Sequence, residues 1–62
     1  MNEVEVRIIV ERPDKLNVGS FKEIYRNTLS YENESKIPFS TIYQDLKVLY
    51  PYPDAFIHFI IV

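Results

Sequence analysis

The sequence contains no cysteine, one histidine and one glycine. Disulfide bridges are therefore excluded, and a structural zinc site lacks the ligands it needs. A chain of 62 residues is one domain at most. Such a chain buries only about 60% of its unfolded surface, so small domains usually need an added source of stability. Association with a second copy is the source that remains, and we expect a homodimer of one domain spanning residues 1–62.

A strong excess of one charge and a long apolar run are also missing. Seven basic and nine acidic residues give a net charge of -2, without the basic stripe that nucleic-acid binding requires. We therefore expect no direct binding of nucleic acid. The longest apolar stretch is far shorter than the roughly 20 residues of a membrane span, and no signal-peptide pattern opens the chain. We expect a cytoplasmic protein that does not associate with membranes.

Residues 3–11 alternate between apolar and polar side chains, which predicts a half-buried strand. Ile9 interrupts the polar set. It is either an isolated apolar side chain at the surface or a contact with a second subunit or another partner. Arg12-Pro13-Asp14-Lys15 has the composition of a turn and ends the strand near Glu11. The apolar set consists of Val4, Val6, Ile8 and Val10.

The segment 21–31 fits two patterns. Ser20 and Glu23 match a capping box, which predicts a helix. The spacing of its aromatic and apolar residues also fits one face of a strand, although the strand would place Glu23 and Asn27 on the apolar face. Local signals favour the helix by a small margin.

The segment 41–50 has the apolar spacing of an amphipathic helix. Thr41 and Gln44 match a second capping box at its start, and Pro51 ends it. Gln44, Lys47 and Val48 are predicted to face away from the core. The predicted covered stripe consists of Ile42, Leu46, Leu49 and Tyr50.

Residues 55–62 form an apolar strand in which both parities are apolar. Both faces then need cover. Either a helix covers one face and a partner subunit the other, or the strand lies inside a sheet shared between two chains. Phe56, Ile60 and Val62 form one parity of the strand. The residues predicted to form the dimer interface are Ile9, Ile57, Phe59 and Ile61.

The sequence offers almost nothing for catalysis, because no nucleophile, base and metal-binding set can be assembled from it. His58, the only imidazole, lies in the apolar strand and is interpreted as a structural or interface histidine. We expect a protein that is not an enzyme and carries no cofactor or metal. Tyrosine is a frequent interface residue. The predicted recognition surface therefore consists of Tyr43, Lys47, Val48, Tyr50 and Tyr52.

The C-terminal half resembles a known family. Val48-Leu49-Tyr50, a three-residue turn, Asp54 and the apolar run Phe56–Ile60 are similar to the end of the small, dimeric, phage-encoded protein inhibitors of uracil-DNA glycosylase. In that family the tripeptide ends a helix, and a short loop, an aspartate and an apolar strand follow. The resemblance covers about 20 residues, mainly within 41–62, and extends to the rest only in chain length and layout.

The resemblance implies a homodimer that inhibits uracil-DNA glycosylase by imitating DNA, with Tyr50 and Leu46 at the contact surface. Lys47 departs from the family, which has an acidic residue there. The lysine is positively charged where an imitation of DNA needs a negative charge, so this position does not support the charge part of the mimicry. The implied fold is α+β, an antiparallel sheet of three strands at about 3–11, 21–31 and 55–62 with a helix at about 41–50. We adopt this fold, and the alternative is a β-α-α-β arrangement in which 21–31 is helical.

Overall fold

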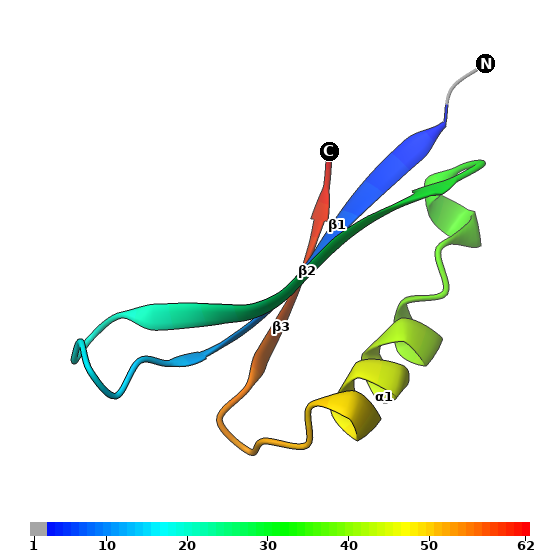
Figure 1. The fold of residues 1–62 in the computed structure, drawn as a ribbon. Coiled ribbons are helices and arrows are strands. Elements are labelled where there is room, and N and C mark those ends of the chain that lie inside the picture. The colour runs from blue at the N-terminus through cyan, green and yellow to red at the C-terminus, as the bar shows by residue number, and fades with distance from the viewer. Residues whose placement is uncertain (1–2) are drawn as a thin grey trace.

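The computed structural model describes residues 3–62 and confirms the α+β fold (Figure 1). The chain forms a three-stranded antiparallel sheet in the order β2-β1-β3, together with one α-helix. Segment 21–31 is a strand, so the local preference for a helix there is wrong. The elements are β1 (Val4–Pro13), β2 (Phe21–Tyr31), a short 3-10 helix η1 (Glu34–Lys36), α1 (Phe39–Leu49) and β3 (Phe56–Ile61).

The core lies between α1 and one face of the sheet. The alternation in β1 places Val6, Ile8 and Val10 on this face, and each is at most 1% exposed. Because β1 is the central strand, its apolar side chains are flanked on both sides as well as covered by the helix. Ile37, which precedes α1, and Leu46 of α1 complete the buried cluster.

A β-bulge in β2 resolves the conflict that the sequence posed at Glu23. Val10 pairs with Tyr25, but the next residue, Glu11, pairs with Glu23, so Ile24 is an extra residue in the ladder. A bulge reverses the parity of the residues beyond it. Glu23 therefore lies on the face away from the helix, while Ile24 and Tyr25 both pack against the core. Simple alternation could not give this result.

The helix begins earlier than its sequence signals suggested. Its first residue is Phe39, and Pro38 occupies the N-cap position without a side-chain hydrogen bond, so Thr41 is not the cap. The Phe39 ring packs edge-on against Phe59 of β3 with centroids 5.2 Å apart, a contact that favours the early start. Leu49 is 67% exposed and does not belong to the covered stripe. The residues of α1 and its C-cap that face the core are Phe39, Ile42, Leu46 and Tyr50.

The hairpin between β1 and β2 extends beyond the helix as an arm (Figure 1). Asp14 shapes its turn by accepting a hydrogen bond from the Leu16 amide at 2.9 Å. Gly19 has a φ of 89°, a conformation that favours glycine. Leu16 and Val18 at this tip are 98% and 94% exposed. Within residues 3–62, no helix has the length and apolar character needed to cross a membrane.

Candidate protein-binding surface

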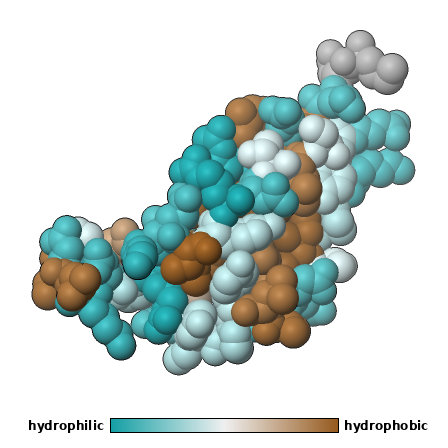
Figure 2. All heavy atoms as spheres, in the orientation of Figure 1, coloured by the Kyte–Doolittle hydropathy of each residue, from teal (hydrophilic) through white to brown (hydrophobic). Residues whose placement is uncertain are grey.

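The outer side of α1 and the loop after it expose several large side chains. Val48 and Leu49 are 78% and 67% exposed at the end of the helix, and Tyr43 and Tyr52 are 45% and 39% exposed. Apolar atoms are visible over the C-terminal half of α1 (Figure 2). Apolar and aromatic side chains grouped in this way are typical of protein-protein contacts. We call this set the helix-exit surface, and it consists of Tyr43, Lys47, Val48, Leu49 and Tyr52.

Lys47 and Tyr43 lie next to each other on the helix-exit surface. The Lys47 ammonium is 6.0 Å from the centre of the Tyr43 ring, the spacing of a weak cation-π contact between residues one helical turn apart. Lys47 is half-buried rather than fully extended into solvent. The Lys47 charge therefore lies beside an aromatic ring within the helix-exit surface.

Two of the predicted contact residues are turned toward the core. Leu46 is only 4% exposed and belongs to the buried cluster, so the contact role that the family resemblance implied for it is wrong. Positions 46 and 42 share the core-facing stripe of α1, which is why Leu46 is covered. Tyr50 is half-buried, and its ring centre is 5.7 Å from that of Tyr25 in β2. Only part of Tyr50 is therefore available to a partner.

Arg12 fixes the loop that carries Tyr52. Its guanidinium carbon lies 3.8 Å from the centre of the Tyr52 ring, and its Nε-H donates to Asp54 Oδ1 at 2.9 Å. The hydrogen bond from Arg12 lowers the pKa of the Asp54 carboxyl. The Arg12 side chain of β1 therefore contacts both Tyr52 and Asp54 in the loop after α1. Sequence analysis assigned Arg12 to a turn, and no local pattern reveals a contact 42 positions away.

The four residues predicted to form the dimer interface do not share a face. Residues directly opposite each other in an antiparallel ladder point to the same side. Ile9 pairs with His58 and lies on the face away from the helix, which we call the open face. The other three pair with Val10, Ile8 and Val6 and lie on the helix side, so the four residues do not form one patch on a single face of the sheet. These helix-side residues are Ile57, Phe59 and Ile61.

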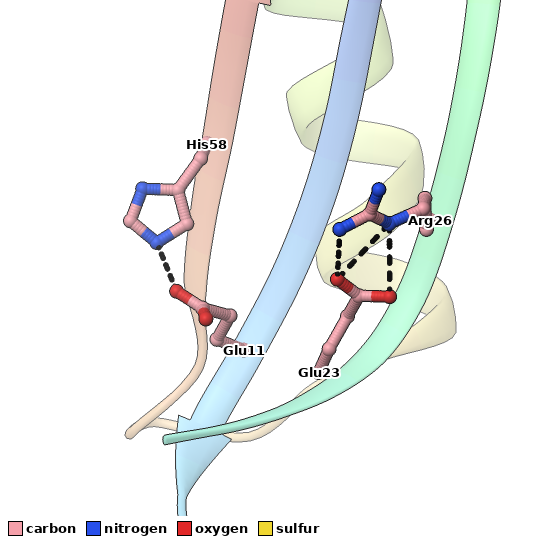
Figure 3. Close-up of polar contacts among 4 residues, drawn as sticks. All are labelled: Glu11, Glu23, Arg26 and His58. Carbon is pink, nitrogen blue, oxygen red and sulfur yellow. Dashed lines mark hydrogen bonds and ion pairs between the residues drawn. The ribbon is translucent and has the colours of Figure 1, made fainter. Parts of the chain in front are cut away.

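The open face combines apolar and charged contacts. The Phe21 and Phe56 rings meet edge-on at 5.6 Å, and both residues are about half exposed. Beside them, His58 Nε2 lies 2.8 Å from Glu11 Oε1, so the one imidazole reaches across from β3 to β1 (Figure 3). These four residues line a shallow hollow of about 160 Å³. The sequence predicted neither pairing, because each joins residues far apart in the chain.

A second ion pair lies on the same face, on β2. Arg26 donates to Glu23 at 2.8 Å, and the two side chains are drawn in front of the strands with α1 behind (Figure 3). The hydrogen bond from Arg26 lowers the pKa of the Glu23 carboxyl, and Glu23 raises that of Arg26. Within residues 3–62, no group of three or more histidine, aspartate and glutamate side chains is arranged to hold a metal ion.

Comparisons with models of protein families, with curated proteins and with solved structures found no match to this chain.

Proposed function

We propose that this chain is a non-enzymatic protein inhibitor that acts as a cytoplasmic homodimer on a DNA-processing enzyme, most concretely uracil-DNA glycosylase. The observation that carries the proposal is the helix-exit surface. Val48 and Leu49 are 78% and 67% exposed at the end of α1, and the exposed Tyr43 and Tyr52 belong to the same surface. Exposed apolar side chains beside tyrosines are typical of a surface that is buried by a partner.

The sequence resemblance supplies the target. Val48-Leu49-Tyr50 ends α1, a short loop follows, and Asp54 precedes the apolar strand β3, in the order that the glycosylase inhibitors have. Acidic groups for the imitation of DNA are available elsewhere on the surface. Glu3 and Glu32 line a hollow of about 450 Å³ together with Tyr31. A basic DNA-binding cleft would be attracted to such groups.

The test adds the purified protein to a glycosylase that excises uracil from a duplex oligonucleotide. We expect excision to stop near an equimolar amount of the homodimer. The variant Val48→Asp should lose inhibition, because it places a charge in the centre of the proposed contact. Leu16→Asp is the matched control: its side chain is also almost fully exposed, but it lies at the hairpin tip. Full excision at a large molar excess of the unaltered protein would refute the proposal.

Two observations favour a second candidate, an interaction module with a different protein target, encoded by a phage or another mobile element. Lys47 lies over the Tyr43 ring at a position where the glycosylase inhibitors have an acidic residue. A net charge of -2 is also modest for a mimic of DNA. Capture of a single host protein other than the glycosylase, with loss of capture in Val48→Asp, would favour this candidate.

A further inference from the structure

The outer edge of β3 carries unpaired main-chain groups. The Val62 amide donates to the Glu5 carbonyl at 2.9 Å, so the even-numbered residues of this strand direct their main-chain groups toward β1. Main-chain groups alternate in direction along an antiparallel strand. Those of Ile57, Phe59 and Ile61 therefore point away from the sheet. Within residues 3–62, no other element supplies them with a backbone hydrogen bond.

The two edges of the sheet differ in how they are protected. The edge strand β2 carries Lys22, Glu23 and Arg26 and is interrupted by the bulge at Ile24. Charges and bulges are the usual devices that keep an edge strand from pairing with another chain. β3 has no proline, lysine, arginine or acidic residue, and its pairing with β1 continues without a register shift. An unprotected apolar edge of this kind is a template for a further strand.

We propose that the β3 strands of two copies pair antiparallel with each other and join the two sheets into one of six strands. The inference specifies the homodimer of the proposed function and rests on it only for the expectation of a two-chain assembly. A second copy fits because the strand is apolar on both sides. On the open face Phe56, Ile60 and Val62 are 51%, 43% and 61% exposed, and Ile61 on the helix side is 44% exposed. Pairing gives these side chains apolar neighbours from the second copy on both faces of the sheet.

The outward main-chain groups of Ile57, Phe59 and Ile61 also favour one register for the pairing of the two β3 strands. In a symmetric antiparallel pair each outward residue must meet an outward residue of the other copy. With the twofold axis at Phe59, Ile57 meets Ile61 of the second copy and all three outward residues are paired. With the axis at His58, Ile61 has no partner inside β3 of the second copy, and with the axis at Ile60, Ile57 has none. The Phe59 register therefore forms the most hydrogen bonds, and it places His58 opposite Ile60 of the second copy.

The pairing has a consequence for the binding surface. An axis perpendicular to the sheet keeps the two α1 helices on the same side of the shared sheet. Each dimer then presents two helix-exit surfaces on one side, while the open faces form one continuous surface on the other. A single target molecule can therefore contact both helix-exit surfaces from the same side of the dimer.

The test uses the absence of cysteine from the chain. His58→Cys and Ile60→Cys are prepared separately, and each is oxidised alone and in an equal mixture. A cross-linked dimer is expected only in the mixture, because residues directly opposite are within the reach of a disulfide, whereas identical residues are diagonal neighbours about 7 to 8 Å apart. Cross-linking of either variant alone, or none in the mixture, would overturn the proposed pairing.

Light scattering supplies an independent measurement. Ile61→Pro removes an outward amide without removing a hydrogen bond to β1, so it should reduce the particle mass from two chains to one while the circular dichroism is kept. Ile61→Ala keeps the amide and should remain a dimer. A monomeric unaltered protein, or a dimeric Ile61→Pro, would contradict the pairing. Its failure is distinct from that of the proposed inhibition, because the pairing is measured by cross-linking and particle mass, whereas inhibition is measured by uracil excision. A homodimer that pairs through another surface would fail the first test and pass the second.

Discussion

Arg12 of β1 and Asp54 of the loop before β3 are joined by a hydrogen bond of 2.9 Å from Nε to Oδ1. The two side chains remain 29% and 43% exposed, so water screens their attraction, and its contribution to global stability is small. Its main effect is on position. The same guanidinium lies 3.8 Å from the Tyr52 ring, and this arrangement orders the loop at the helix exit.

Replacing Arg12 with glutamine should weaken binding of the target more than it weakens the fold. The substitution removes both the ion pair and the contact with Tyr52, so the loop loses its order and must regain it on binding. We expect severalfold weaker inhibition and a nearly unchanged thermal midpoint. Arg7→Gln, on the open face of the same strand, is the matched control and should leave inhibition intact. Equal inhibition by both variants would show that the loop does not depend on Arg12.

The ion pair between Arg12 and Asp54 should break in acid, at the pH where the Asp54 carboxyl becomes protonated. The hydrogen bond from Arg12 lowers the pKa of this carboxyl in the folded state. The stabilisation is therefore complete above the ordinary aspartate value of about 3.9 and is lost as the pH falls through the lowered folded-state pKa. The Arg12 Nε-H resonance in NMR spectra should shift at that point. In Asp54→Asn the same resonance should show no such inflection, and an identical inflection there would assign the change to another group.

Leu46 and Val48 should respond in opposite ways to truncation. Leu46 is buried, so Leu46→Ala leaves a cavity and should cost about 2 to 5 kcal/mol of unfolding free energy in urea. Val48 is 78% exposed, and Val48→Ala should change stability by less than about 0.5 kcal/mol while weakening inhibition. Loss of inhibition by Leu46→Ala under conditions where it remains folded would return Leu46 to the contact surface.

The sequence was sufficient for the order and type of the three strands and the α-helix once the layout of the family it resembles was used for 21–31, but it did not predict η1. The predicted bounds of β2 and β3 lie within one residue of those observed, because turn residues and prolines mark their ends. Local reasoning failed at Glu23, since strict alternation placed a charge on the apolar face. The bulge at Ile24 depends on pairing with β1, and pairing is a property of two strands together.

The candidate protein-binding surface was predicted only in part, for a similar reason. Tyr43, Val48 and Tyr52 are exposed as expected, since their positions follow from helical spacing and the prolines. Helical spacing placed Ile42, Leu46 and Tyr50 correctly in the covered stripe, and only Leu49 lies outside it. The contact role of Leu46 came from the family resemblance, and its burial contradicts that role. The role of Arg12 comes from tertiary contact alone and has no local signature.

The contact between Phe21 and Phe56 provides a test of how the hairpin arm is attached to the sheet. The rings meet edge-on at 5.6 Å with an interplanar angle of 82°, a favourable geometry for aromatic pairs. Phe21→Leu and Phe56→Leu, with the double variant, form a double-mutant cycle. The coupling energy from urea unfolding should be about 0.5 to 1.5 kcal/mol.

A matched cycle between Phe56 and Leu16 should give no coupling, because Leu16 is 98% exposed at the hairpin tip and has no packing to lose. The Phe21–Phe56 contact links the base of the arm to the first residue of β3, so each single variant should also speed amide exchange at the start of that strand. A coupling energy near zero, with unchanged amide exchange at the start of β3, would mean that the contact between the two rings does not stabilise the attachment of the hairpin arm to the sheet.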